Sequence, residues 1–270
     1  MNKKNFKVKL LVICLIGALL TSHMIIAMAS STGEVKTTVS NFSQLYSAMI
    51  QAKDGDVIGI NGTISIVGEK KNVGYADKHI ILKRMNSSSR FNVSSEVIFK
   101  NVTFDGDEIS ASIPYIYTSG DVTFQNVTFK NSINRSSGGG AIFVVNKTAN
   151  FNNCTFENNT AAVGGHIYVN NSANVTIEKS LLKNGHAITY GGAIVNGMDT
   201  ATVNVISSTI TGNSAERHGG GITNLGTMHI AGSKIYDNTA PNGSDISNYP
   251  WGYLYLSDTI EVLVKLFEND

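Results

Sequence analysis

The chain has 270 residues, of which 42% are hydrophobic and 15% charged, and its formal net charge at pH 7 is +1. Binding to nucleic acid through phosphate contacts needs concentrated basic charge, so the near balance of 21 basic and 20 acidic residues argues against a nucleic-acid partner. One of the two cysteines lies in the N-terminal segment described next, so no intrachain disulfide is expected in the exported protein.

Residues 1–29 are predicted to be a signal peptide. Basic residues between Lys3 and Lys9 precede an apolar run from Leu10 to Leu20, and cleavage is predicted after Ala29, where the pattern is small-x-small. Removing four lysines and no acids lowers the formal charge from +1 to −3. The apolar run is short for a membrane span of about 20 residues, and no later segment is long and apolar enough to cross a bilayer. We therefore expect a secreted or cell-surface protein.

Residues 40–53, SNFSQLYSAMIQAK, are predicted to form an amphipathic helix that covers the N-terminal end of the fold. Leu45 and Met49 fall on its apolar face, and Asn41 and Gln44 have the spacing of a capping box. Residues 54–98 fit the repeat described below only as irregular first rungs. Their basic residues form either a solvated face or a contact surface for an acidic cell-surface polymer: Lys70, Lys71, Lys78, Lys83, Arg84 and Arg90.

Residues 99–260 contain a regular repeat with two markers. The first is a pair of apolar residues five positions apart, whose second members recur at Phe104, Phe129, Phe156, Leu182, Ile210 and Ile235, with Ile260 expected next. The second is a glycine pair before an apolar strand, as in Gly139-Gly140-Ala141-Ile142 and Gly164-Gly165-His166-Ile167. Periods of this length are typical of solenoids, and Gly and Asn between the short apolar segments are typical of turns.

No part of the repeat has sustained helical periodicity, which argues against helical and leucine-rich solenoids. We predict an all-β fold, a right-handed parallel β-helix of about seven rungs of 24–28 residues, as a single domain over residues 30–270. Residues 261–270 are the terminal segment, and the pattern around them, SDTIEVLVKLF, fits either a helix or a last strand.

Stacked rungs place equivalent residues in columns, and strand alternation predicts which columns face outward. These are a threonine column, Thr103, Thr128, Thr155 and Thr209, and a column of alternating charge, Asp105, Lys130, Glu157 and Lys183. Opposite charges on neighbouring strands stabilise by about 0.2–1 kcal/mol per pair, so the charged column is expected to hold rungs together. Cys154 is predicted to be a small core residue. His166 directly precedes an inward Ile167 and is therefore predicted to face outward.

The sequence contains few groups that could form a reaction site. Glycoside hydrolysis needs two carboxyl groups at a defined separation and a calcium site needs several converging oxygens, but the densest acidic cluster, Asp105, Asp107 and Glu108, is better interpreted as a turn. The glycine pairs lack the spacing of phosphate-binding loops. No catalytic residue, cofactor or metal site is predicted. The candidate ligand contacts are Lys183, His186, Arg217 and His218.

Thirteen Asn-x-Ser/Thr sequons occur in the sequence. In a host that glycosylates exported proteins they are predicted acceptors, and they include Asn101, Asn126, Asn153, Asn158 and Asn174.

The combination of Gly-Gly-Ala-Ile with Phe-x-x-Asn, as in Phe156-Glu157-Asn158-Asn159, resembles the repeats of polymorphic outer-membrane proteins and of adhesin-like β-helix proteins of archaeal and bacterial surfaces. The resemblance covers about residues 99–260. It implies surface display and adhesion, with a cell-surface glycan or a protein receptor as partner. Exported β-helices also include polysaccharide lyases and hydrolases, so a carbohydrate-active enzyme is the alternative, and a non-adhesive envelope or ice-binding surface protein is a third.

Overall fold

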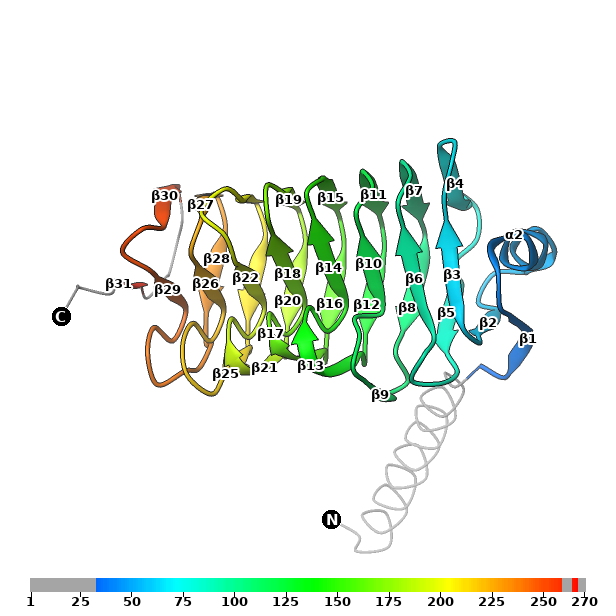
Figure 1. The fold of residues 1–270 in the computed structure, drawn as a ribbon, viewed down its shortest axis with the longest axis horizontal. Coiled ribbons are helices and arrows are strands. Elements are labelled where there is room, and N and C mark those ends of the chain that lie inside the picture. The colour runs from blue at the N-terminus through cyan, green and yellow to red at the C-terminus, as the bar shows by residue number, and fades with distance from the viewer. Residues whose placement is uncertain (1–32, 259–263, 267–270) are drawn as a thin grey trace, which may run out of the picture. The chain divides into compact units, whose positions relative to one another are not determined.

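The computed structural model of the protein describes residues 33–258 and 264–266 (Figure 1). Val35–Asp270 is one compact unit. Of the other unit, Met1–Glu34, only residues 33 and 34 are described, so the predicted signal peptide and its cleavage site at Ala29 lie outside the described residues. Among the helices that are described, none is both long enough and apolar enough to span a membrane.

The unit from Val35 onward is a parallel β-helix built from four sheets, named A to D here. Sheet A contains β1 (Val35–Val39), β2 (Val57–Ile60), β5 (Ile80–Arg84), β8 (Val102–Asp105), β12 (Thr128–Lys130), β16 (Thr155–Glu157), β20 (Leu181–Lys183), β24 (Thr209–Thr211) and β28 (Lys234–Tyr236). Sheet B contains β3 (Thr63–Ile66), β6 (Arg90–Val93), β10 (Ile116–Thr118), β14 (Ile142–Val145), β18 (Ile167–Asn170), β22 (Ile194–Asn196), β26 (Ile222–Asn224), β29 (Ile246–Asn248) and β31 (Val264–Leu266).

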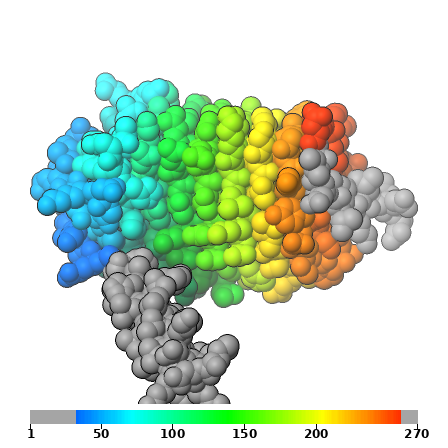
Figure 2. All heavy atoms as spheres, turned by 180° about the vertical axis from the view of Figure 1, so that it is seen from behind, coloured from blue at the N-terminus to red at the C-terminus, as the bar shows by residue number. Residues whose placement is uncertain are grey.

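Sheet C contains β4 (Lys71–Gly74), β7 (Val97–Lys100), β11 (Val122–Gln125), β15 (Thr148–Asn152), β19 (Asn174–Glu178), β23 (Thr202–Ile206), β27 (Thr227–Ala231) and β30 (Tyr253–Ser257). The short sheet D contains β9 (Ser110–Ala111), β13 (Ile133–Gly138), β17 (Thr160–Val163), β21 (His186–Tyr190) and β25 (Ser214–Ala215). The chain therefore passes from sheet A to D, B and C in each full rung, and consecutive rungs form successive bands along the coil (Figure 2).

Two aromatic columns fill the core where the first repeat marker predicts them. Phe104, Phe129 and Phe156 stack with ring centroids 5.5 and 4.5 Å apart and planes within 10° of parallel. The partner column of Phe99, Phe124 and Phe151 stacks at 5.2 and 4.9 Å. All six rings are buried. Offset and edge-to-face aromatic pairs contribute about 0.5–1.5 kcal/mol each beyond their buried area, so the columns join neighbouring rungs.

The structure has about nine turns rather than the predicted seven, because residues 54–98 also follow the coil. Val73 pairs with Phe99, and Leu82 pairs with Phe104. These two inward residues are nine positions apart instead of five, since four additional residues lie between β4 and β5. Residues 54–98 thus form rungs with one longer corner, and the strands on both sides of that corner are in register.

The basic residues of this segment largely have local partners. Lys70 pairs with Glu96 at 2.5 Å, and Lys83 with Asp107 at 2.9 Å. Lys78 donates to the carbonyl oxygens of Met49, Ile50 and Ala52 at 2.9, 3.2 and 2.7 Å. Cations are favourable at the C-terminal end of a helix because the last carbonyls there lack intrahelical partners.

The helix whose C-terminal end Lys78 contacts is α2 (Phe42–Gln51), the single helix among the described residues. Asn41 Oδ1 accepts from the N–H of Gln44, and Gln44 Oε1 accepts from the N–H of Ser40, both at 2.9 Å. Leu45 and Met49 are buried in the same core cluster as the inward residues of the first turns. The packing of α2 on the first strands is visible at the blue end of the coil in Figure 1.

At the other end, β30 extends sheet C and β31 extends sheet B by pairing with β29. The terminal segment was predicted to be either a helix or a last strand, and Val264–Leu266 form a strand. The expected rung position at Ile260 lies outside the described residues, as do residues 267–270.

Candidate functional site

The charged column lies on the outer face of sheet A in the predicted register. Asp105, Lys130, Glu157 and Lys183 occupy equivalent positions on consecutive rungs. Lys130 Nζ lies 3.4 Å from Asp105 Oδ2, and Lys183 Nζ lies 3.1 Å from Glu157 Oε2. Exposed ion pairs are worth roughly 0–1 kcal/mol, so the column makes a modest contribution to stacking.

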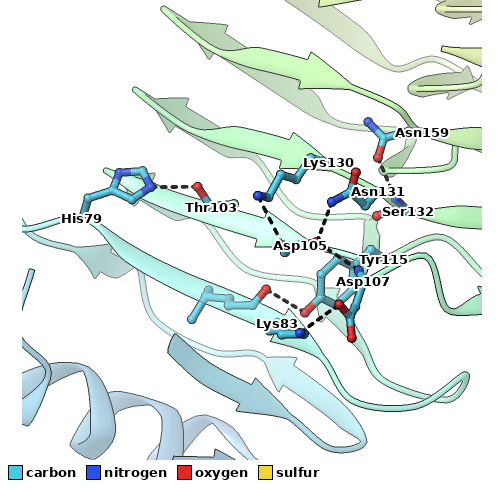
Figure 3. A network of polar contacts seen from close by, with 11 residues as sticks. His79, Lys83, Thr103, Asp105, Asp107, Tyr115, Lys130, Asn131, Ser132 and Asn159 are labelled. Atoms are coloured by element: carbon cyan, nitrogen blue, oxygen red, sulfur yellow. Dashed lines mark hydrogen bonds and ion pairs between the residues drawn. The ribbon is translucent and has the colours of Figure 1, made fainter. Parts of the chain in front are cut away.

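The acidic cluster at the end of β8 is a turn in which the carboxylates of Asp105 and Asp107 have partners (Figure 3). Asp105 Oδ1 accepts from the Asn131 side chain at 3.1 Å and from the N–H of Asp107 at 3.0 Å. Asp107 pairs with Lys83, and both Asp107 and Glu108 have left-handed backbone conformations, with φ of 53° and 55°. Within the described residues no group of three or more His, Cys, Asp or Glu side chains is arranged to hold a metal ion.

The threonine column has the predicted register but is not uniformly a surface feature. Thr128 and Thr155 are half-buried, whereas Thr103 is buried, with its hydroxyl 2.7 Å from His79 Nε2. Leu181 interrupts the column as expected.

The predicted ligand contacts are divided between two places. Lys183 is on sheet A and pairs with Glu157. His186 is on sheet D, with Nδ1 3.0 Å from Ser214 Oγ and Nε2 3.8 Å from Glu216 Oε1. Glu216 connects His186 to the segment that holds the other two candidates.

Arg217 and His218 lie directly before the glycine turn at Gly219. The His218 ring stacks on Tyr190 with centroids 5.4 Å apart, and it meets Tyr249 edge-on at 6.2 Å. Burial raises the pKa of Tyr249, and the nearby Arg217 opposes that shift. The four candidates therefore do not converge on one cleft, and His218 belongs to an aromatic cluster that the sequence pattern did not indicate.

The prediction that His166 faces outward was wrong, because its side chain is fully buried. The N–H groups of His166 and Ile167 both donate to the carbonyl oxygen of Ala193, each at 3.0 Å. Residue 166 is thus still part of the turn that follows Gly164, whose φ is +62°. Strand alternation begins only after this turn, so the rule that placed the imidazole outside does not apply to it.

The imidazole completes a buried column of asparagine side chains. In this column the backbone N–H of one rung donates to the amide oxygen of the next, as in Ser132 to Asn159 at 2.9 Å and Asn213 to Asn238 at 3.0 Å. Gly185 occupies the position between Asn159 and Asn213. A Cβ on Gly185 would lie 2.7 Å from His166 Nε2, so the histidine fills the space that the glycine leaves.

The protonation state of His166 follows from its two partners. Nδ1 lies 2.9 Å from Asn159 Nδ2, which can only donate, and Nε2 lies 3.1 Å from Asn213 Oδ1, which can only accept. The imidazole is therefore neutral with its proton on Nε2. Burial lowers the pKa of His166 to about 3, in agreement with a structural role.

Cys154 is a buried core residue, as predicted. Burial raises the pKa of its thiol to about 12. A thiol is reactive mainly as the thiolate, so this side chain contributes packing.

The sequon asparagines have different structural settings. Asn101, Asn126 and Asn153 stand at the corner between sheets C and A with φ between 51° and 54°. Asn126 donates to Asn101 Oδ1 at 3.1 Å, and Asn153 to Asn126 Oδ1 at 2.6 Å. Asn158 has φ 55°, and Asn174 is an exposed strand residue. Their glycosylation remains a prediction.

Sequence reasoning missed a row of aromatic side chains on the outer face of sheet B. Tyr117, Phe143 and Tyr168 are equivalent residues of β10, β14 and β18. Their ring centroids are 5.5 and 4.8 Å apart, with interplanar angles of 77° and 55°. All three are partly exposed. The available signal was the aromatic residue that directly follows the inward Ile in three successive copies of the repeat.

Small residues on both sides shape this aromatic row. A Cβ on Gly138 would lie 2.3 Å from the Tyr168 ring, and one on Gly197 would lie 2.6 Å from it. The ring therefore lies close against the backbone of two other rungs, and burial raises the pKa of its hydroxyl.

A pocket of about 270 Å³ opens beside the N-terminal end of the row. Tyr117 lines it together with polar side chains from β3, β6 and the residues that follow β6 and β10: Ser65, Asn92, Ser94 and Ser119. Asn92 Oδ1 is shielded from solvent and accepts no hydrogen bond from the described residues. Leaving such an oxygen unpaired costs about 1–3 kcal/mol, so rotation of the Asn92 amide toward the pocket would favour a ligand that donates a hydrogen bond.

No protein-family model matches the chain, and no curated protein matches its sequence. The function is therefore inferred from the parallel β-helix and its surfaces.

Proposed function

We propose that this chain is an exported cell-surface protein with an adhesin-like binding role, and that the outer face of sheet B is its binding surface. The parallel β-helix fold and the Gly-Gly/Phe-x-x-Asn repeat support the general class. The observation that carries the choice of surface is the aromatic row formed by Tyr117, Phe143 and Tyr168. Partly exposed aromatic rings on a rigid sheet are typical of binding surfaces because they offer a large contact area at a low cost in conformational entropy.

The carboxylates on the outer face of sheet A and in the turn after β8 fit a role in stability. Asp105, Asp107 and Glu157 each have a lysine partner within 3.4 Å. A general acid or nucleophile in glycoside hydrolysis works as one of two carboxyl groups that face a common substrate. Carboxylates that are neutralised by lysines of neighbouring rungs fit a stabilising role instead.

Export is part of the proposal and rests on residues 1–29 of the sequence. Expression of the full chain in a secreting host, followed by N-terminal sequencing of the exported product, tests it. The proposal expects a chain that begins at Ser30. Retention of the intact N-terminus inside the cell would contradict export.

Binding is tested with fluorescently labelled residues 30–270 applied to panels of intact microbial and animal cells. Saturable binding that unlabelled protein displaces is expected on at least one cell type. The enzyme alternative predicts something else: release of reducing or unsaturated sugars from a polysaccharide panel. Sugar release without saturable cell binding would replace the adhesin proposal by that alternative.

A further inference from the structure

We propose that the ligand of sheet B is an uncharged carbohydrate, bound as a short oligosaccharide segment along the aromatic row. This inference rests on the proposed binding function and names the chemical class of the ligand. It starts from the side chains that face outward in the same column as the row.

The outward column of sheet B carries no charge over five consecutive rungs, from β3 to β18. The paired strands place these residues in it: Ser65, Asn92, Tyr117, Phe143 and Tyr168. The equivalent residues of the next three rungs, Val195, Thr223 and Ser247, are buried. The equivalent column of sheet A, by contrast, contains Lys83, Asp105, Lys130, Glu157 and Lys183. A charged ligand on sheet B would lose solvation without gaining an ionic partner from the column itself, so the column favours a neutral ligand. Arg90 shares the outward face of β6 with Asn92 and lies outside the column.

The aromatic rings favour a ligand with C–H groups on a flat face. The face of an aromatic ring carries partial negative charge, and the polarised C–H bonds of a sugar ring complement it. The interplanar angles of 77° and 55° mean that the rings do not cover one another completely. Each of the three rungs can therefore contribute contact area to a ligand that runs along the coil.

The polar groups beside the rings favour a ligand with hydroxyl groups. Asn92 Oδ1 lacks a hydrogen-bond donor. The Asn92 side chain lines the pocket next to Tyr117, together with Ser65, Ser94 and Ser119. Asn170, on β18 two residues after Tyr168, also has an amide oxygen with no partner among the described residues. Unpaired amide oxygens thus lie at both ends of the row, and rotation of either amide would present its oxygen to a ligand hydroxyl. The pocket of about 270 Å³ is slightly smaller than the typical 300–1,000 Å³ site of a drug-sized ligand, which fits one sugar ring at the end of a chain.

The test uses residues 30–270 and soluble neutral polymers, namely dextran, mannan, galactan and a β-glucan, in affinity electrophoresis and calorimetry. Heparin and polygalacturonate are the charged comparators. We expect at least one neutral polymer to bind and the charged polymers not to compete. Phe143→Ser and Tyr117→Ser should each weaken that binding about tenfold, as expected for an interface residue worth about 1.4 kcal/mol. The matched control is Tyr253→Ser, which removes an exposed tyrosine from sheet C.

Thermal unfolding of each variant separates loss of binding from loss of fold, and Asn92→Leu provides a variant outside the aromatic row that should also weaken binding. Failure of all four neutral polymers, preference for the charged ones, or equal binding by Phe143→Ser, Tyr117→Ser and Tyr253→Ser would overturn the inference. Cell binding that survives periodate oxidation of the cell glycans but not protease treatment would show a protein receptor. That result leaves the adhesin proposal intact and refutes the carbohydrate ligand.

Discussion

His166 and Asn213 are 47 residues apart in the sequence, yet His166 Nε2 donates to Asn213 Oδ1 at 3.1 Å in the buried corner between sheets A and D. The bond spans the rung in which Gly185 interrupts the asparagine column. A histidine in the glycine turn and a glycine in the asparagine column thus form a compensating pair.

Replacing His166 with Ala should lower the free energy of unfolding by about 2–4 kcal/mol. The change creates a cavity and removes one partner each from Asn159 and Asn213. Urea unfolding followed by circular dichroism measures the loss. Thr176→Ala, which shortens an outward side chain of sheet C, should change stability by less than about 0.5 kcal/mol. Equal effects of the two substitutions would contradict the buried role of the imidazole.

The same histidine should make stability depend on pH. Because burial lowers the pKa of His166 in the folded protein to about 3, and the ordinary value is 6.5, the unfolded chain binds one more proton between these values. The stability contribution is complete above pH 6.5 and is lost as pH falls toward 3, at up to about 1.4 kcal/mol per unit. His79 shifts in the same direction because it is partly buried.

The comparison of wild type with His166→Gln isolates this contribution, since His79 is common to both proteins. Free energies of unfolding measured at pH 7.5, 6.5 and 5.5 should fall more steeply for the wild type. Parallel curves would show that His166 titrates normally.

The ion pair between Glu157 and Lys183 should make a small, salt-sensitive contribution. Glu157→Lys places like charges on three consecutive rungs and should reduce stability by about 1 kcal/mol at low ionic strength. The reduction should become smaller in 1 M NaCl, where the Debye length is about 3 Å. Thr176→Lys introduces a lysine into sheet C and serves as the control. A loss that is independent of salt would indicate a packing defect.

Cys154 should resist alkylation in the native protein. Burial and the raised pKa of about 12 keep the thiol protonated and covered. Iodoacetamide at pH 8 should modify it only in denaturant, as mass spectrometry would show. Rapid modification under native conditions would mean that the coil opens locally around β15 and β16.

The sequence predicted the coil correctly where a residue type repeats at a constant interval. The phenylalanine columns and the charged column follow directly from the spacing of Phe104, Phe129 and Phe156. Prediction failed where the backbone changes length or direction. The nine-residue interval between Val73 and Leu82 hid two strands, since corners of a coil can lengthen without disturbing the stacking.

The errors in the site have a similar origin. The alternation of strand side chains was applied to His166 although that residue belongs to a turn. The aromatic row was missed because Tyr117, Phe143 and Tyr168 were each considered within their own segment, and the property that matters is their stacking across rungs. The partners of Asn92 and His186 depend on side-chain positions that no sequence spacing specifies.

Hydroxyl-radical footprinting of residues 30–270 bound to target cells shows which sheet of the coil contacts the target. Aromatic side chains are readily oxidised, so mass spectrometry can follow each ring with and without the target. We expect Tyr117, Phe143 and Tyr168 to be protected on binding while Tyr253 and Tyr255 on sheet C stay unchanged. Protection confined to sheet C, or to the segment around Arg217 and His218, would show that sheet B is not the binding surface.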